Sequence, residues 1–213
     1  MPARIATPIS RVVRQALGTM ELNFYMRTGR DVMGPIVEDL TPPVDLDRDH
    51  WRGGARAPVT LVEYGDYECP YSRMAFRNIR RLEQQLAGQL RFVFRHLPLT
   101  RIHPHALAAA HLAEAAALQG RFWPMHELLF HRQQALEDSD LLGYADQLGL
   151  DQHQLLADLD GQTVRQRVQA DADSALASGA RGTPTLFING RLQVAGYDEA
   201  TLGAALAAAI KEA

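Results

Sequence analysis

The sequence of 213 residues is long enough for one well-packed core with appendages, and 46% hydrophobic with 22% charged residues is ordinary for a globular protein. The net charge of -3 gives no reason to expect a nucleic-acid partner. The single cysteine excludes an internal disulfide, and no apolar run is as long as a membrane span or resembles a signal-peptide core. We therefore expect a cytoplasmic protein without a membrane span.

Residues 1–43 are predicted to form an N-terminal extension and a linker. Four apolar residues recur at helical spacing between arginines, which indicates an amphipathic basic helix: Ile9, Val12, Val13 and Leu17. We interpret it as a surface helix packed on its own domain. A membrane surface, a protein partner or a second copy of the chain in a homodimer are the alternatives. Thr41-Pro42-Pro43 is typical of a stiff linker.

A strand, a turn and a helix start surround the only cysteine. The strand is predicted at 59–64, and Cys69 is followed by Pro70, a residue favoured at the first helical position. Cys69 would then lie at the N-cap, where unpaired backbone N–H groups and the helix dipole favour a thiolate. A buried structural cysteine would need neither the cap nor the proline, so we interpret Cys69 as a nucleophile.

Glu63 stands six residues before Cys69, within the apolar run of that strand. Alternation along a strand would direct its side chain into the interior, beneath the helix that follows Cys69. A buried carboxyl group near a sulfur can accept and return the proton of the sulfur. The alternative is an edge-strand carboxylate that faces water.

The rest of the chain shows strand and helix signals around a long helical block. After a helix at about 70–86, residues 90–94 alternate like a strand, so the two strands are expected to be parallel and joined by a helical crossover. Residues 104–180 are almost wholly helical in pattern. Asn189-Gly190 predicts a two-residue hairpin turn, and a last helix is expected at about 198–211.

Five of the eight histidines lie in the helical block, which raises the question of a metal site: His103, His105, His111, His126 and His131. His126 and His131 are five positions apart, and side chains at that spacing diverge by about 140° around a helix. Structural zinc usually requires cysteines or convergent histidines. We therefore expect no metal site and no bound cofactor.

A late proline adds a further element. Gly182-Thr183-Pro184 places it at the start of a strand, where sheets tolerate proline. Together with Glu63, the strand and the Cys69-Pro70 helix start, it resembles the thioredoxin superfamily, specifically the DsbA-like branch, over about residues 44–211. In that family the proline is cis and lies against the active-site sulfur, and the residue before it offers backbone groups to the substrate. The resemblance assigns these roles to Pro184 and Thr183.

The resemblance also implies the architecture, which is an α/β protein with a thioredoxin fold and an inserted helical domain. Residues 44–100 and 181–213 would form the thioredoxin-fold domain. Residues 101–180 would form the inserted helical domain, which in this family covers one side of the active site.

The motif departs from the redox members of the family at its fourth position, where Ser72 replaces the second cysteine. In a dithiol enzyme the second sulfur resolves the mixed disulfide, which a hydroxyl group cannot do. Cys-Pro-Tyr-Ser is thus a monothiol variant, natural or engineered. It resembles monothiol glutaredoxins, which use glutathione as the external thiol, and kappa-class glutathione transferases, which carry Ser-Pro-Tyr-Ser. Ser72 could donate a hydrogen bond to the thiolate or fill vacated space, and Tyr71 could shape the substrate groove or pack as an ordinary surface residue.

The predicted function is a thiol-disulfide oxidoreductase that acts by a monothiol mechanism on protein or glutathione mixed disulfides. The expected site consists of three catalytic residues, Cys69, Ser72 and Glu63, and four substrate-binding residues, Pro70, Tyr71, Thr183 and Pro184. The partner would be a disulfide-containing protein or peptide, with glutathione as a co-substrate. The alternatives are a glutathione-dependent transferase or isomerase of the kappa type and a redox-inert module that binds peptides as a chaperone.

Overall fold

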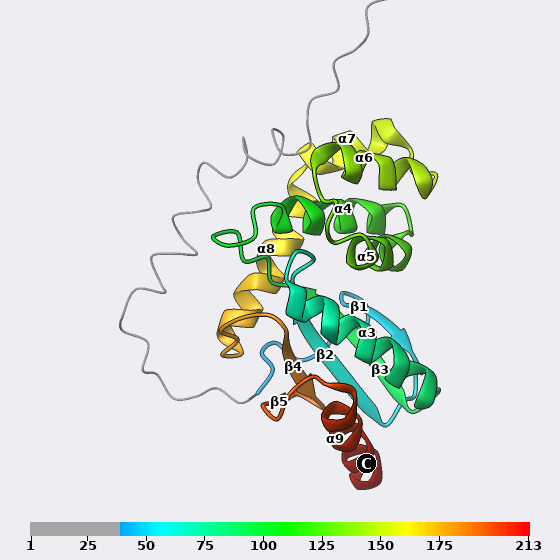
Figure 1. Ribbon diagram of the computed structural model, residues 1–213, viewed down its shortest axis with the longest axis vertical. Coiled ribbons are helices and arrows are strands. Elements are labelled where there is room, and N and C mark those ends of the chain that lie inside the picture. The colour runs from blue at the N-terminus through cyan, green and yellow to red at the C-terminus, as the bar shows by residue number, and fades with distance from the viewer. Residues whose placement is uncertain (1–38) are drawn as a thin grey trace, which may run out of the picture.

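The computed structural model describes residues 39–213, and the extension expected to form a basic helix lies outside this range. The described residues form one five-stranded sheet in the order β1-β3-β2-β4-β5 (Figure 1). Its strands are β1 (His50–Gly53), β2 (Val59–Gly65), β3 (Leu90–His96), β4 (Thr185–Ile188) and β5 (Arg191–Gln193). The α/β class and the thioredoxin fold expected from the sequence are confirmed.

The helices form two groups, those that pack on the sheet and those of the insertion between β3 and β4. Two of them pack beside each other on one face, α3 (Pro70–Gln85) after β2 and α9 (Glu199–Glu212) at the end of the chain. Five lie between β3 and β4: α4 (Ala106–Leu118), α5 (Phe122–His131), α6 (Asp138–Gln147), α7 (Gln152–Asp160) and α8 (Gln162–Ala177). In Figure 1, α4 to α7 gather beyond one end of the sheet and α8 returns from them toward β4.

The central strand β2 is parallel to β3 and antiparallel to β4. Val62 pairs with Val93 of β3 on one side and with Phe187 of β4 on the other, so the middle of β2 is paired along both edges. A crossover through α3 is the connection that a parallel β2–β3 pair requires. The parallel pair predicted from the sequence is therefore confirmed, as is the hairpin at Asn189-Gly190, which joins β4 to antiparallel β5.

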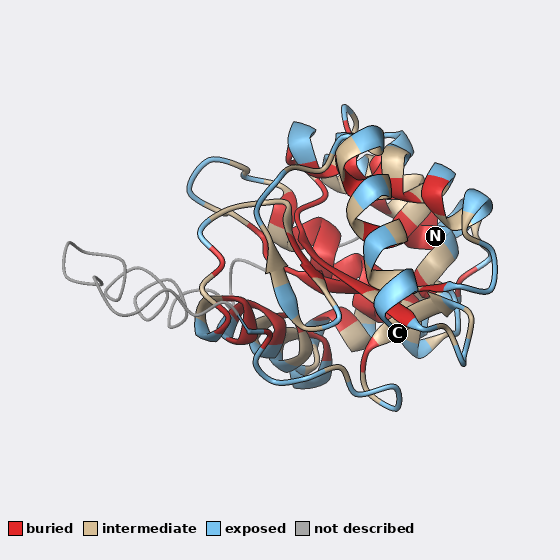
Figure 2. Cartoon of the chain, turned by 90° about the horizontal axis from the view of Figure 1, so that it is seen from below, coloured by how far each residue is buried: buried red, intermediate tan, exposed pale blue. Residues whose placement is uncertain are grey.

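The inner strands β2 and β3 are buried on both faces, and the sheet runs between helices in Figure 2. Leu61 packs into a core shared with α3, α9 and the helices of the insertion. Its neighbour Val62 points the other way, into a smaller core with Ala172 and Ala175 of α8. Because alternate residues of a strand share a face, Glu63 is on the same side as Leu61, the side that α3 covers.

The segment expected to be a stiff linker lies against the sheet. The guanidinium of Arg95, fully buried on β3, donates to the carbonyl oxygens of Pro42 and Pro43 at 3.0 and 3.1 Å. It also pairs with Asp49 at 2.8 Å and with the hydroxyl of Tyr64 at 3.0 Å. These bonds satisfy a buried charge and attach the segment before β1 to the centre of the sheet. No helix within residues 39–213 combines the length and the apolar character needed to cross a membrane.

Candidate active site

Cys69 is the N-cap of α3, and Pro70 is the first helical residue. The thiol is buried and donates a hydrogen bond to the carbonyl oxygen of Thr183 at 3.3 Å. The Thr183–Pro184 peptide bond is cis, as the resemblance implied. The structure thus brings together two segments that are far apart in the sequence, the helix start and the proline before β4.

Glu63 lies fully buried on β2, as the alternation of the strand predicted. Neither of its carboxyl oxygens has a hydrogen-bond partner. Burial raises the pKa of Glu63 to about 8, against a smaller lowering by the charge of Arg52. An isolated carboxylate is costly in such surroundings, so the group is predominantly protonated at neutral pH.

Ser72 is fully buried in the first turn of α3, and its hydroxyl oxygen accepts a hydrogen bond from the backbone N–H of Asp66 at 3.3 Å. This bond braces the loop before α3 and leaves the hydroxyl proton of Ser72 as a donor, so donation to the thiolate stays a prediction. Tyr71 is on the surface with 57% of the residue exposed.

Tyr197 is a site residue that the sequence reasoning missed. Its ring centroid lies 6.5 Å from that of Tyr71. Burial raises the pKa of its phenol, and the neighbouring Tyr71 and Cys69 raise it further. Only the chain's return after β5 brings Tyr197 beside Tyr71, and no local pattern in the sequence indicates this contact.

The loop from Asp66 to Cys69 is bonded to the helical insertion through each of its residues. Asp66 is buried, and its carboxylate accepts from the backbone N–H groups of Glu68 and Leu99, both at 2.8 Å. The same carboxylate pairs with the ring of His103 at 2.8 Å. Burial raises the pKa of Asp66, although these hydrogen bonds oppose the shift.

Two more histidines hold the same loop. Glu68 pairs with Nδ1 of His105 at 3.0 Å, and this hydrogen bond raises the pKa of His105. The hydroxyl of Tyr67 pairs with Nδ1 of His126 at 3.1 Å. Burial lowers the pKa of His126 well below its usual value, so its ring is neutral. Three of the histidines weighed as metal ligands therefore brace the loop that carries Cys69.

One group among the described residues has the spacing of a metal site: His96, Glu114 and Asp171. Glu114 already accepts from His96 and from His50, both at 2.8 Å, and Asp171 pairs with Arg48 at 3.0 Å. The charges of this buried network thus have protein partners. The absence of a metal site stays a prediction.

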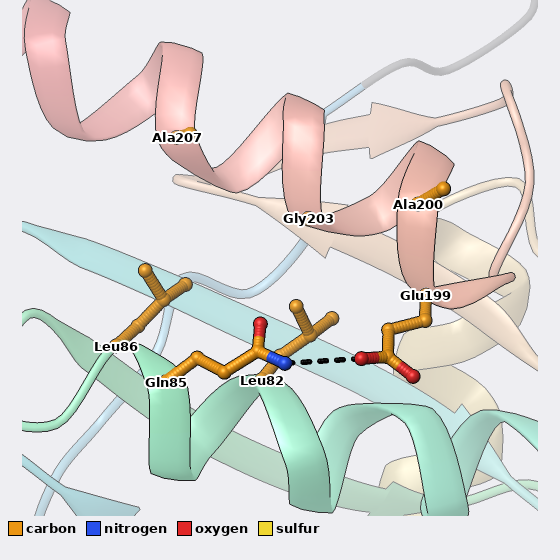
Figure 3. A pocket seen from close by; sticks show the side chains of 7 residues that line it. All are labelled: Leu82, Gln85, Leu86, Glu199, Ala200, Gly203 and Ala207. Atoms are coloured by element: carbon orange, nitrogen blue, oxygen red, sulfur yellow. Dashed lines mark hydrogen bonds between the residues drawn. The ribbon is translucent and has the colours of Figure 1, made fainter.

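A pocket of about 480 Å³ lies between α3 and α9 (Figure 3). It is lined by Leu82, Gln85, Leu86, Glu199, Ala200, Gly203 and Ala207. The amide of Gln85 donates to Glu199 across it at 3.0 Å. Leu82 is 13 residues along α3 from Cys69, or roughly 20 Å at 1.5 Å per residue, so this pocket is separate from the thiol.

Solved structures and a family pattern match most of the chain. The family described as Thioredoxin matches residues 45–211. DsbA2 of Pseudomonas aeruginosa is 30% identical, with a TM-score of 0.64 over 76% of this chain and 95% of its own. A thioredoxin-like oxidoreductase from Silicibacter pomeroyi is 28% identical, with a TM-score of 0.70 over 78% of this chain and 94% of its own.

Curated relatives carry a different name. A Na(+)/H(+) antiporter NhaA 1 of Salinispora arenicola is 48% identical over 80% of this chain and 26% of its own length. The Na(+)/H(+) antiporter NhaA of Herminiimonas arsenicoxydans is 42% identical over 97% of this chain and 33% of its own length. The chain thus spans about a quarter to a third of these relatives.

These names correct one expectation from the sequence. The description as a cytoplasmic redox protein is wrong, because relatives at 42–48% identity are named for Na(+)/H(+) antiport. The fold is unaffected by this correction, since the family pattern over residues 45–211 and the solved structures match it independently. By that match, the chain belongs to the thioredoxin family and has the DsbA-like fold of thiol-disulfide oxidoreductases.

Proposed function

We propose that this chain is a thiol-disulfide oxidoreductase that works with a single thiol, Cys69. The observation that carries the proposal is the position of the sulfur, at the N-cap of α3 and 3.3 Å from the carbonyl oxygen of Thr183. Backbone N–H groups at a helix start favour an anionic sulfur. The backbone beside cis Pro184 is then placed to hold an extended substrate next to it.

The reaction consists of two thiol–disulfide exchanges. The Cys69 thiolate attacks one sulfur of a substrate disulfide, which forms a mixed disulfide and releases the other sulfur as a thiolate. An external thiol such as glutathione then attacks the mixed disulfide, leaves with the substrate sulfur and returns the Cys69 thiolate. The external thiol is required because Ser72 has no sulfur with which to resolve the intermediate.

Glu63 supplies a proton store for these steps. Its pKa of about 8 lets the carboxyl group give up and regain a proton near neutral pH. The lack of hydrogen-bond partners leaves both of its oxygens free for this exchange. On the outer side, Tyr71 and Tyr197 form an aromatic rim that a substrate would contact, together with Pro70.

The test is glutathione-driven reduction of a small glutathione mixed disulfide by the wild type, Cys69→Ser and Ser72→Cys. We expect turnover by the wild type, a single glutathione adduct in its intact mass, and loss of both in Cys69→Ser. No adduct and no turnover unless Ser72 is replaced by cysteine would contradict the monothiol mechanism. Conjugation of glutathione to an aromatic electrophile, dependent on Ser72, would favour the transferase alternative instead.

We further propose that the chain serves a Na(+)/H(+) antiporter, because the relatives that it matches over 80–97% of its length bear that name. The matching segment of the Herminiimonas arsenicoxydans protein can be exchanged for this chain, with and without Cys69→Ser. Na(+)-dependent proton movement is then measured in membrane vesicles with oxidised or reduced glutathione. We expect the rate of proton movement to differ between oxidised and reduced glutathione, and this difference to require Cys69. Proton movement that is the same whichever segment is present would refute this role.

A further inference from the structure

Gln133 lies just after α5 and reaches from the helical insertion to the loop that carries the thiol. Its side chain is buried, with 6% of the residue exposed. Nε2 donates to the carbonyl oxygen of Tyr67 at 2.7 Å and to that of Cys69 at 2.9 Å. One amide group thus bonds two carbonyls that lie on either side of Glu68.

These two carbonyls belong to the backbone that leads into and out of Cys69. The carbonyl of Cys69 also accepts the backbone N–H of Arg73 at 3.1 Å, the first hydrogen bond of α3. Fixing it from a second side holds the peptide plane between Cys69 and Pro70. The bond to Tyr67 holds the approach to the cysteine, so that the loop cannot turn without breaking a buried hydrogen bond.

The chemistry of glutamine suits this place. An amide nitrogen carries two hydrogens and can donate to both carbonyls at once, whereas a carboxylate of the same size only accepts. The backbone and the aliphatic part of Gln133 belong to the helical insertion and not to the sheet. The residue therefore links the insertion to the reacting thiol by direct bonds.

We infer that Gln133 is a positioning residue for Cys69, which holds the loop so that the sulfur faces the Thr183 carbonyl and an incoming disulfide. It acts through the backbone and does not touch the substrate. The inference rests on the proposed function only in that Cys69 is the reacting group.

The test compares Gln133→Met with Gln119→Met. Methionine keeps the length of the side chain but donates no hydrogen bond. Gln119 is a matched control, because it also braces a loop through paired backbone bonds. Its Oε1 accepts from the N–H of Asp151 at 2.9 Å and its Nε2 donates to the carbonyl of Asp151 at 3.3 Å, within the helical insertion.

The readout is the second-order rate at which Cys69 reacts with an aromatic disulfide, measured per titratable thiol. The Cys69 thiolate forms a mixed disulfide with one half of the reagent and releases the other half as a coloured thiolate. We expect Gln133→Met to lower this rate about tenfold, as small displacements of reacting groups do, and Gln119→Met to change it less than about twofold. In concentrated urea all three proteins should react at one rate.

A wild-type rate in folded Gln133→Met, or an equal loss in Gln119→Met, would overturn the inference. Gln133→Asn, which keeps the amide but withdraws it by one methylene, should give an intermediate rate. If Gln133→Met does not fold, Gln133→Asn replaces it in the test. A wild-type rate in Gln133→Asn would then contradict the proposal. The reagent reports on the thiol itself, so failure of glutathione turnover would refute the proposed function without affecting this comparison.

Discussion

At the scale of single residues, Glu63 links the chemistry of the site to the stability of the fold. Its pKa is raised to about 8 from an ordinary value of 4.5 because the carboxyl group is fully buried. Between these values the folded chain keeps a proton that the unfolded chain has lost. The contribution of Glu63 to stability is therefore full below about pH 4.5 and is lost as the pH rises through about 8.

We expect Glu63→Gln to remove this loss. In the wild type the Glu63 contribution should fall by on the order of 4 kcal/mol between pH 5 and 8, at 1.36 kcal/mol for each pH unit. Urea unfolding at several pH values measures it as the difference in slope between wild type and Glu63→Gln. The exposed Glu212→Gln should keep the wild-type slope, and an unchanged slope in Glu63→Gln would show that the buried carboxyl is already ionised.

The sequence could predict those site residues whose position depends on local pattern. The proline after Cys69 indicates the helix start, and strand alternation indicates the burial of Glu63. Gly-Thr-Pro before a strand indicated the cis bond at Pro184 once the resemblance was drawn. Tyr197 and Gln133 could not be predicted, because the contact of Tyr197 with Tyr71 and the bonds of Gln133 to the Cys69 loop depend on how distant segments meet.

At the scale of elements, the loop between β2 and α3 joins the sheet to the helical insertion. Its residues are bonded to the turn after β3 and to α5, so the helical insertion holds the start of α3. The sequence shows that His103, His105 and His126 lie near one another along the chain, but their hydrogen-bond partners could not be predicted from it. Their partners are Asp66, Tyr67 and Glu68, which lie tens of residues earlier in the chain.

Asp66→Asn tests this junction. The amide replaces one carboxylate oxygen with a donor, which would then face the N–H of Glu68 or that of Leu99. The variant would also weaken the hydrogen bond with His103. A buried polar group left without its partner costs about 1–3 kcal/mol, so we expect the free energy of unfolding to fall by about that amount.

Asp198→Asn is the matched control for that measurement. Asp198 is the N-cap of α9 and accepts the backbone N–H of Thr201 at 3.0 Å. Asparagine caps helices as well as aspartate does, so this variant should unfold close to the wild type. If Asp66→Asn were as stable as Asp198→Asn in urea, the loop would not depend on its acceptors.

At the scale of the whole molecule, a buried network joins the insertion to the sheet. Glu114 of α4 accepts from His50 of β1 and from His96 of β3. Burial alone would raise the pKa of Glu114, but the hydrogen bonds from the two histidines lower it well below its ordinary value. The parallel strand pair and the helical block could be predicted from periodicity. This connection could not, since charged residues in a helix pattern are normally assigned to the solvent.

Glu114→Gln is expected to separate the insertion from the sheet energetically. Removing one partner of a buried pair costs about 3–5 kcal/mol, so the free energy of unfolding at pH 7 should fall by that amount. Because the pKa of Glu114 is lowered in the folded state, its contribution is present above about pH 4.5 and is lost as the pH falls further. The variant should therefore show a smaller loss on acidification than the wild type.

Glu199→Gln is the control, because it breaks only the surface pair with Arg81. It should change neither the free energy of unfolding at pH 7 nor its loss on acidification appreciably. Equal acid sensitivity of wild type and Glu114→Gln in urea titrations at pH 3 to 7 would mean that Glu114 does not hold the two parts together.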